Sequence, residues 1–132
     1  MKKENIVLII DQNPNRRNNL SSRLRMMGYS TELSSSGFHS ISLLEEAQKQ
    51  KKFYRLILIV GEAEDMPGRE ILLLMRAINT SKTALPILYV NKDKDPDEIL
   101  NVIKDGANDY IVESHNDSQI VTKVKKFAPI EA

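Results

Sequence analysis

Acidic side chains follow two apolar runs of this sequence, and they are the residues whose types could support chemistry. Asp11 follows the run at residues 6–10, while Glu62, Glu64 and Asp65 follow the run at residues 56–60. Carboxylates could hold a cation or accept a transferred group. For Asp11 we favour the simpler role of an acid near a helix N-terminus, and for the other three that of a solvated loop.

Several classes of site lack their key residues. The chain has no cysteine, which excludes disulfides and thiolate chemistry, and His39 and His115 have no neighbour at metal-ligand spacing. Residues 11–14 contain no glycine, which argues against a dinucleotide or phosphate-binding turn. Val60 ends the run at residues 56–60 and Gly61 follows it, and neither can react.

The apolar runs predict the strands that must position these side chains. Residues 6–10 and 56–60 are uninterrupted, branched and too short for helices, so we expect two central strands covered on both faces. Residues 86–90 predict another strand, residues 109–112 a short one, and residues 29–33 a less apolar strand near an edge.

Helical patterns separate these strands. We expect helices over residues 14–27, 37–47, 67–78, 96–104 and 117–127, with Asn13 and Asp95 as N-caps. Strand and helix alternate five times, which predicts a doubly wound α/β sheet of parallel strands. We find no linker or repeat, so we expect one domain over residues 1–132 with its core at about 5–127.

The composition narrows the functional classes. The 132 residues are 41% hydrophobic and 28% charged with a net charge of +1, which favours a folded chain without a general attraction to nucleic acid or membrane. The first apolar run is too short for a signal or membrane span, so we expect a cytoplasmic protein.

In order along the chain, several fragments resemble the receiver domain of two-component response regulators. They are residues 10–14 followed by Arg17, which resemble the family's acidic first turn, then Gly28-Tyr29, Met66 with Gly68 and Glu70, Pro86-Ile87, and Gly106-Ala107-Asn108-Asp109-Tyr110-Ile111. The resemblance covers residues 6–127. It implies a flavodoxin-like (CheY-like) five-stranded fold with strand order 2-1-3-4-5.

The resemblance fails at the phosphorylation site. Carried over by position, the nucleophilic aspartate falls at Val60, the second metal-binding acid at Gln12, the hydroxyl residue at Asn91 and the lysine at Glu113. Only Asp11 matches the family. We therefore interpret the chain as a degenerate pseudo-receiver that does not run the phosphoryl-transfer cycle, and we expect no catalytic residue and no cofactor. Asp11 remains a weak candidate Mg²⁺ ligand.

The predicted function is thus a non-catalytic signalling module of two-component or phosphorelay type. By resemblance, its protein partner is a kinase, an output domain or a second copy, bound through residues 97–104, 110–112 and 120–127. We expect no nucleic acid or membrane partner. The alternatives are a divergent active receiver that phosphorylates another acid, and a flavodoxin-like binder of a small ligand.

Three further features have open interpretations. Lys92 either pairs with Asp11 or Glu113 as an internal counter-charge or faces solvent. Tyr110 matches the switch aromatic of receivers, or is a half-buried strand residue. The arginines of the first helix could dock a partner or nucleic acid, but aromatic residues are not interleaved with them and we expect a solvated face. They are Arg16, Arg17, Arg23 and Arg25.

Overall fold

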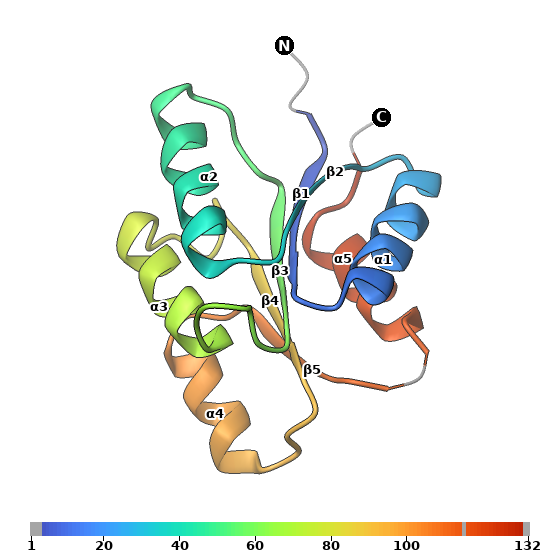
Figure 1. Ribbon diagram of the computed structural model, residues 1–132, viewed down its shortest axis with the longest axis vertical. Coiled ribbons are helices and arrows are strands. Elements are labelled where there is room, and N and C mark those ends of the chain that lie inside the picture. The colour runs from blue at the N-terminus through green and yellow to red at the C-terminus, as the bar shows by residue number, and fades with distance from the viewer. Residues whose placement is uncertain (1–3, 115, 131–132) are drawn as a thin grey trace.

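Five strands and five helices alternate along the part of the chain that the computed structural model describes, residues 4–114 and 116–130. The strands are β1 (Ile6–Asp11), β2 (Ser30–Ser34), β3 (Leu56–Val60), β4 (Ile87–Asn91) and β5 (Asp109–Val112). The helices are α1 (Pro14–Met26), α2 (Gly37–Lys49), α3 (Gly68–Ile78), α4 (Pro96–Lys104) and α5 (Ser118–Phe127). All strand pairs are parallel, in the order β2-β1-β3-β4-β5 (Figure 1). The predicted fold class and strand order are confirmed.

The two most apolar runs form the centre of the sheet. Every residue of β1 and of β3 is buried, because β-strands and helices cover both strands on all sides. In contrast, β2 carries exposed and half-buried residues and lies at one edge, as its weaker apolar pattern predicts.

The sheet has a core on each face, and successive residues of β1 alternate between them. Leu8 packs in one cluster with residues of α2, α3 and α4, whereas Ile9 packs in the other with residues of α1 and α5. Figure 1 shows the same division, with α2, α3 and α4 on one side of the sheet and α1 and α5 on the other.

Polar residues at the strand ends differ slightly from the prediction. Asp11 and Asn91 are the last residues of β1 and β4 and not the first residues of loops, because they pair with Val60 and Val112 of the neighbouring strands. The predicted caps Asn13 and Asp95 accept hydrogen bonds from backbone N–H groups of α1 and α4. None of the helices in the described residues is long and apolar enough to cross a membrane.

Candidate functional site

The positions that correspond to a receiver phosphorylation site converge at the carboxyl ends of the strands. Asp11 is the register partner of Val60, Val60 is that of Val90, and Asn91 is that of Val112. Glu113 follows β5 directly and its N–H donates to the backbone oxygen of Asn91 at 2.8 Å. The strand topology therefore brings the carboxyl ends of β1, β3, β4 and β5 together at one end of the sheet. Gln12 is exposed in the turn after Asp11.

The guanidinium of Arg16 lies at this edge between two carboxylates. Its Nε and Nη2 atoms donate to the two oxygens of Asp11 at 2.5 and 2.7 Å, and its Nη1 donates to Glu113. The Asp11 side chain is fully buried, whereas those of Arg16 and Glu113 are 22% and 19% exposed. The hydrogen bond to Asp11 and the charges of both acids outweigh burial and raise the pKa of Arg16. The arginine therefore stays charged and offsets one of the two negative charges.

The local sequence fixes Arg16 in this position. Asn13 caps α1 by accepting from the N–H groups of Asn15 and Arg16, so the arginine stands in the first turn. Asp11 also accepts from the N–H of Asn13 at 2.9 Å, and its backbone oxygen accepts from Arg17 Nη1 at 2.9 Å. Beneath the guanidinium is Gly61, whose φ of +65° is a conformation that favours glycine.

Arg16 is the site residue that sequence reasoning missed. We expected it on a solvated face, and that prediction is wrong because the first turn of α1 lies beside the β5–α5 loop. The internal counter-charge considered for Lys92 is supplied by Arg16 instead. Lys92 is exposed and its N–H donates to the side chain of Asn91.

The position that aligns with the nucleophile holds no reactive group. Val60 is 1% exposed and packs in the apolar cluster that faces α1 and α5. Its neighbours at the same level of the sheet are Asp11 and Val90, and Asp11 is engaged with Arg16.

Two of the loop acids after β3 cap helices. Asp65 accepts from the N–H groups of Gly37 and Phe38 at 2.6 and 3.1 Å and from the hydroxyl of Ser36 at 2.8 Å, at the N-terminus of α2. These bonds, led by the one from Gly37, lower the pKa of Asp65. Glu62 accepts from the N–H of Gly68 at 3.2 Å at the start of α3, and Glu64 is exposed. All three acidic residues of the loop are thus exposed to solvent, as expected, but Glu62 and Asp65 also accept hydrogen bonds from helix N-termini.

The side chain of Tyr110 is buried, and not half-buried as the simpler interpretation expected. It is 9% exposed, its ring centroid lies 5.7 Å from that of Tyr89, and its hydroxyl donates to the backbone oxygen of Asp93 at 2.7 Å. Burial is the main cause that raises the pKa of both tyrosines, that of Tyr89 to about 12. The pair ties β4 and β5 to the loop before α4.

The donor groups at the strand ends do not suit Mg²⁺ in this conformation. Mg²⁺ prefers oxygen ligands in octahedral geometry, and both oxygens of Asp11 already accept from the guanidinium. The second acid position is the amide Gln12. Among residues 4–114 and 116–130, no three histidine or acidic side chains form a cluster that could hold a metal ion. His115 lies outside the described residues, and His39 Nδ1 is 2.9 Å from Ser34 Oγ.

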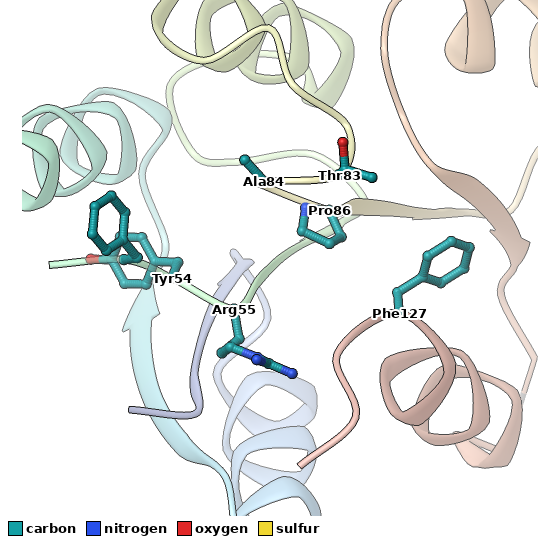
Figure 2. Close-up of a pocket in the computed structure, with 7 residues that line it drawn as sticks. Tyr54, Arg55, Thr83, Ala84, Pro86 and Phe127 are labelled. Atoms are coloured by element: carbon teal, nitrogen blue, oxygen red, sulfur yellow. The ribbon is translucent and has the colours of Figure 1, made fainter. Parts of the chain in front are cut away.

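A pocket of about 300 Å³ lies at the opposite end of the sheet. Its lining residues precede β3 and β4 or end α5: Phe53, Tyr54, Arg55, Thr83, Ala84, Pro86 and Phe127 (Figure 2). Ligands of open α/β sheets bind at the carboxyl ends of strands, so this pocket does not match the flavodoxin-like ligand site considered from the sequence.

Comparisons with known proteins agree with this architecture. The structure is similar to a CheY-like response regulator receiver domain protein from Methanospirillum hungatei JF-1, with 19% identity, a TM-score of 0.79 and coverage of 94% of this chain and 93% of that chain. A two-component response regulator from Clostridium difficile shares 24% identity, with a TM-score of 0.78 and coverage of 94% and 95%. The CheX–CheY–BeF₃–Mg²⁺ complex from Borrelia burgdorferi gives a TM-score of 0.82 at 12% identity, with coverage of 94% and 89%.

No curated protein matches the sequence. The family model of the response regulator receiver domain matches residues 7–125. This match spans all five strands and the strand ends where Arg16 bridges Asp11 and Glu113. The chain belongs to the response regulator receiver domain family.

Proposed function

We propose that this receiver domain is a non-catalytic module of two-component signalling that acts in the cytoplasm through protein contacts, without aspartyl phosphorylation. The observation that carries the proposal is the Arg16 bridge between Asp11 and Glu113 beside Val60. A guanidinium supplies the positive charge that a metal ion and a lysine supply in phosphoryl-transfer sites. One of the two negative charges at this end of the sheet is therefore balanced from within the chain.

The substituted positions support the proposal separately. Val60 has no nucleophilic atom, and Glu113 is a carboxylate at the position where the family has a lysine. The negative charge of Glu113 would repel an incoming phosphoryl group, whereas the lysine of the family attracts it. In this proposal Asp11 stabilises the fold and does not bind a metal ion. The positions of the degenerate phosphorylation site are Asp11, Gln12, Val60, Asn91 and Glu113.

The proposed partner surface is the face made by α4, β5 and α5. Leu100 of α4 is 51% exposed, which leaves an apolar side chain available on this face. The buried Tyr110 side chain and its bond to Asp93 hold β5 against the loop before α4. In this proposal the tyrosine is fixed by packing, because no phosphoryl group is present to move it.

Intact-mass analysis after incubation with acetyl phosphate and Mg²⁺ tests the proposal. The native chain is expected to gain no phosphoryl adduct, and a Val60→Asp variant that also carries Arg16→Met and Glu113→Lys is expected to gain one. The variant shows that the conditions support acyl phosphate formation on this fold. Folding of each protein is checked by circular dichroism.

A hydroxylamine-sensitive adduct on the native chain would overturn the proposal in favour of a divergent active receiver. Glu62→Gln, Glu64→Gln and Asp65→Asn variants would then locate the acceptor, since these are the acids of the loop that follows β3. Loss of the adduct in only one variant would assign it.

A further inference from the structure

The two helices on one face of the sheet are basic. The sequence of α1 contains four arginines and no acidic residue, and that of α5 contains three lysines and no acidic residue. The helices on the other face, α2, α3 and α4, together contain five acidic residues and four lysines or arginines. The small net charge of the chain therefore conceals an unequal distribution between its faces.

The two basic helices form one surface. Leu20 and Leu24 of α1 pack in the same buried cluster as Ile120 and Val124 of α5. Figure 1 shows α1 and α5 on the same side of the sheet, so their outer faces are adjacent. The outward positions of both helices are mostly polar or charged, and Met26 of α1 is an exposed apolar exception.

Some of these cations have partners within the chain. Arg16 bonds Asp11 and Glu113, Arg17 donates to the backbone oxygen of Asp11, and Lys123 Nζ is 2.7 Å from Asp109 Oδ2. Lys126 lies over the ring of Phe127, 5.4 Å from its centroid. These contacts account for four of the seven cations.

The other three are exposed and form no salt bridge within residues 4–114 and 116–130. They are Arg23, Arg25 and Lys125, and we call them, with Met26, the basic face. Arg23 stands two helical turns after Arg16 and hence on the side of α1 that faces the β5–α5 loop. Lys125 stands two residues after Lys123, on the side of α5 turned away from Asp109.

We propose that the basic face binds an acidic segment of a partner protein. Arginine fits carboxylates bidentately, and neither Arg23 nor Arg25 forms a salt bridge with another described residue. Met26 follows Arg25 directly and is 88% exposed, and methionine and arginine are both enriched in protein–protein interfaces. No residue of α1 is aromatic, and the one aromatic residue of α5, Phe127, is half-buried with Lys126 over its ring, so the basic face lacks an exposed ring for the stacking that accompanies single-stranded nucleic acid binding.

This surface differs from the face proposed above, because it includes α1 and excludes α4. It requires no phosphoryl group and no change at the strand ends. The inference therefore stands independently of whether the chain is phosphorylated, and binding and mass measurements test the two proposals separately.

The test uses a fluorescent helical peptide with one glutamate face and one leucine face, and anisotropy as the readout. The double variant R23E/K125E reverses two charges of the basic face, and K49E/K51E reverses two exposed lysines at and just after the end of α2 as a matched control. We expect the first variant to weaken binding about tenfold and the control to leave it unchanged. Binding should also weaken as NaCl rises, because the charges are exposed.

Amide chemical-shift mapping with the same peptide is expected to show changes on α1 and α5. Equal weakening by both variants, shifts confined to α3 and α4, or tighter binding of an equally charged DNA oligonucleotide would overturn the proposal. Concentration-dependent self-association that only R23E/K125E abolishes would overturn it too, in favour of a second copy. An R23Q/K125Q variant separates loss of attraction from introduced repulsion, and its failure to weaken binding would count against the proposal.

Discussion

Two carboxylates meet at the end of the sheet with one guanidinium between them, and this arrangement explains why the first turn of α1 tolerates a half-buried arginine. Asp11 has no exposure of its own, so removing its partner leaves an uncompensated charge in a low-dielectric site. The same arginine reaches Glu113 from a position 97 residues away in sequence. Arg16 therefore stabilises the contact between the beginning and the end of the chain.

The substitution Arg16→Met tests this role. We expect it to lower the free energy of unfolding by about 2–3 kcal/mol, below the range for a fully buried pair because Arg16 is partly exposed. Urea unfolding at neutral pH, followed by circular dichroism, measures the change. The matched control is Arg23→Met, which removes an unpaired exposed arginine of the same helix and should cost less than about 0.5 kcal/mol. Equal costs for the two variants would contradict the structural role, and Asp11→Asn added to Arg16→Met should restore part of the loss.

Sequence reasoning located the strand ends but not the charge that joins them. The sequence places Asp11, Asn91 and Glu113 directly after apolar runs and Val60 at the end of one. Their convergence was predictable because the strands are parallel. The partner of Asp11 was not, because helical periodicity places Arg16 outside the apolar stripe of α1 and does not show that the β5–α5 loop covers that side. The same limit applies to Lys92, whose proximity in sequence to the strand end favoured a pairing that Arg16 makes instead.

At the level of elements, the loop that leads from β3 to α3 also contacts α2. Asp65 binds the N-terminus of α2, 28 residues earlier, and Glu62 binds that of α3. At the start of α3 a Cβ on Gly68 would lie 2.6 Å from the backbone oxygen of Gly61 and 2.9 Å from the hydroxyl of Tyr89, so glycine is required there. Local sequence predicted the polar character of this loop, whereas its contacts depend on helix α2, which is distant in sequence.

The substitution Asp65→Asn tests the connection between the loop and α2. The backbone N–H groups of Gly37 and Phe38 lower the pKa of Asp65 in the folded state, so its stabilising contribution is complete above the unfolded value of 3.8 and disappears as the pH falls through the folded value. We therefore expect a lower Tm for the variant at pH 7 and a smaller difference from the native chain at pH 3. Thermal unfolding monitored by circular dichroism at both pH values measures it.

The neighbouring Glu64→Gln provides the control for Asp65. It removes an exposed carboxylate from the same loop, and we expect it to leave Tm unchanged at both pH values. If Glu64→Gln lowers Tm as much as Asp65→Asn does, the effect comes from the net charge of the loop and not from the cap of α2.

For the whole molecule, the two faces of the sheet differ in what they offer to partners. The apolar cores on both sides were predictable, because uninterrupted runs at β1 and β3 require helices above and below them. The division of charge between the helix layers follows from the topology, which places the first and last helices together. Composition alone averages the two layers and indicates a neutral protein.

The effect of Mg²⁺ and beryllofluoride on the Tm of the whole fold distinguishes a receiver whose Asp11 is already bound by Arg16 from an active receiver. Any ligand that binds only the folded chain raises its stability by about 2.7 kcal/mol at a hundredfold excess over Kd, which shifts Tm by several degrees in a domain of this size. We expect no shift for the native chain, because Arg16 holds both oxygens of Asp11 and Val60 provides no carboxylate for the anion. The variant that combines Arg16→Met, Val60→Asp and Glu113→Lys should show the shift, as measured by differential scanning calorimetry with and without the two reagents. If the Tm of the native chain shifts and Asp11→Asn abolishes the shift, Arg16 can be displaced and the carboxyl end of the sheet binds Mg²⁺ and beryllofluoride.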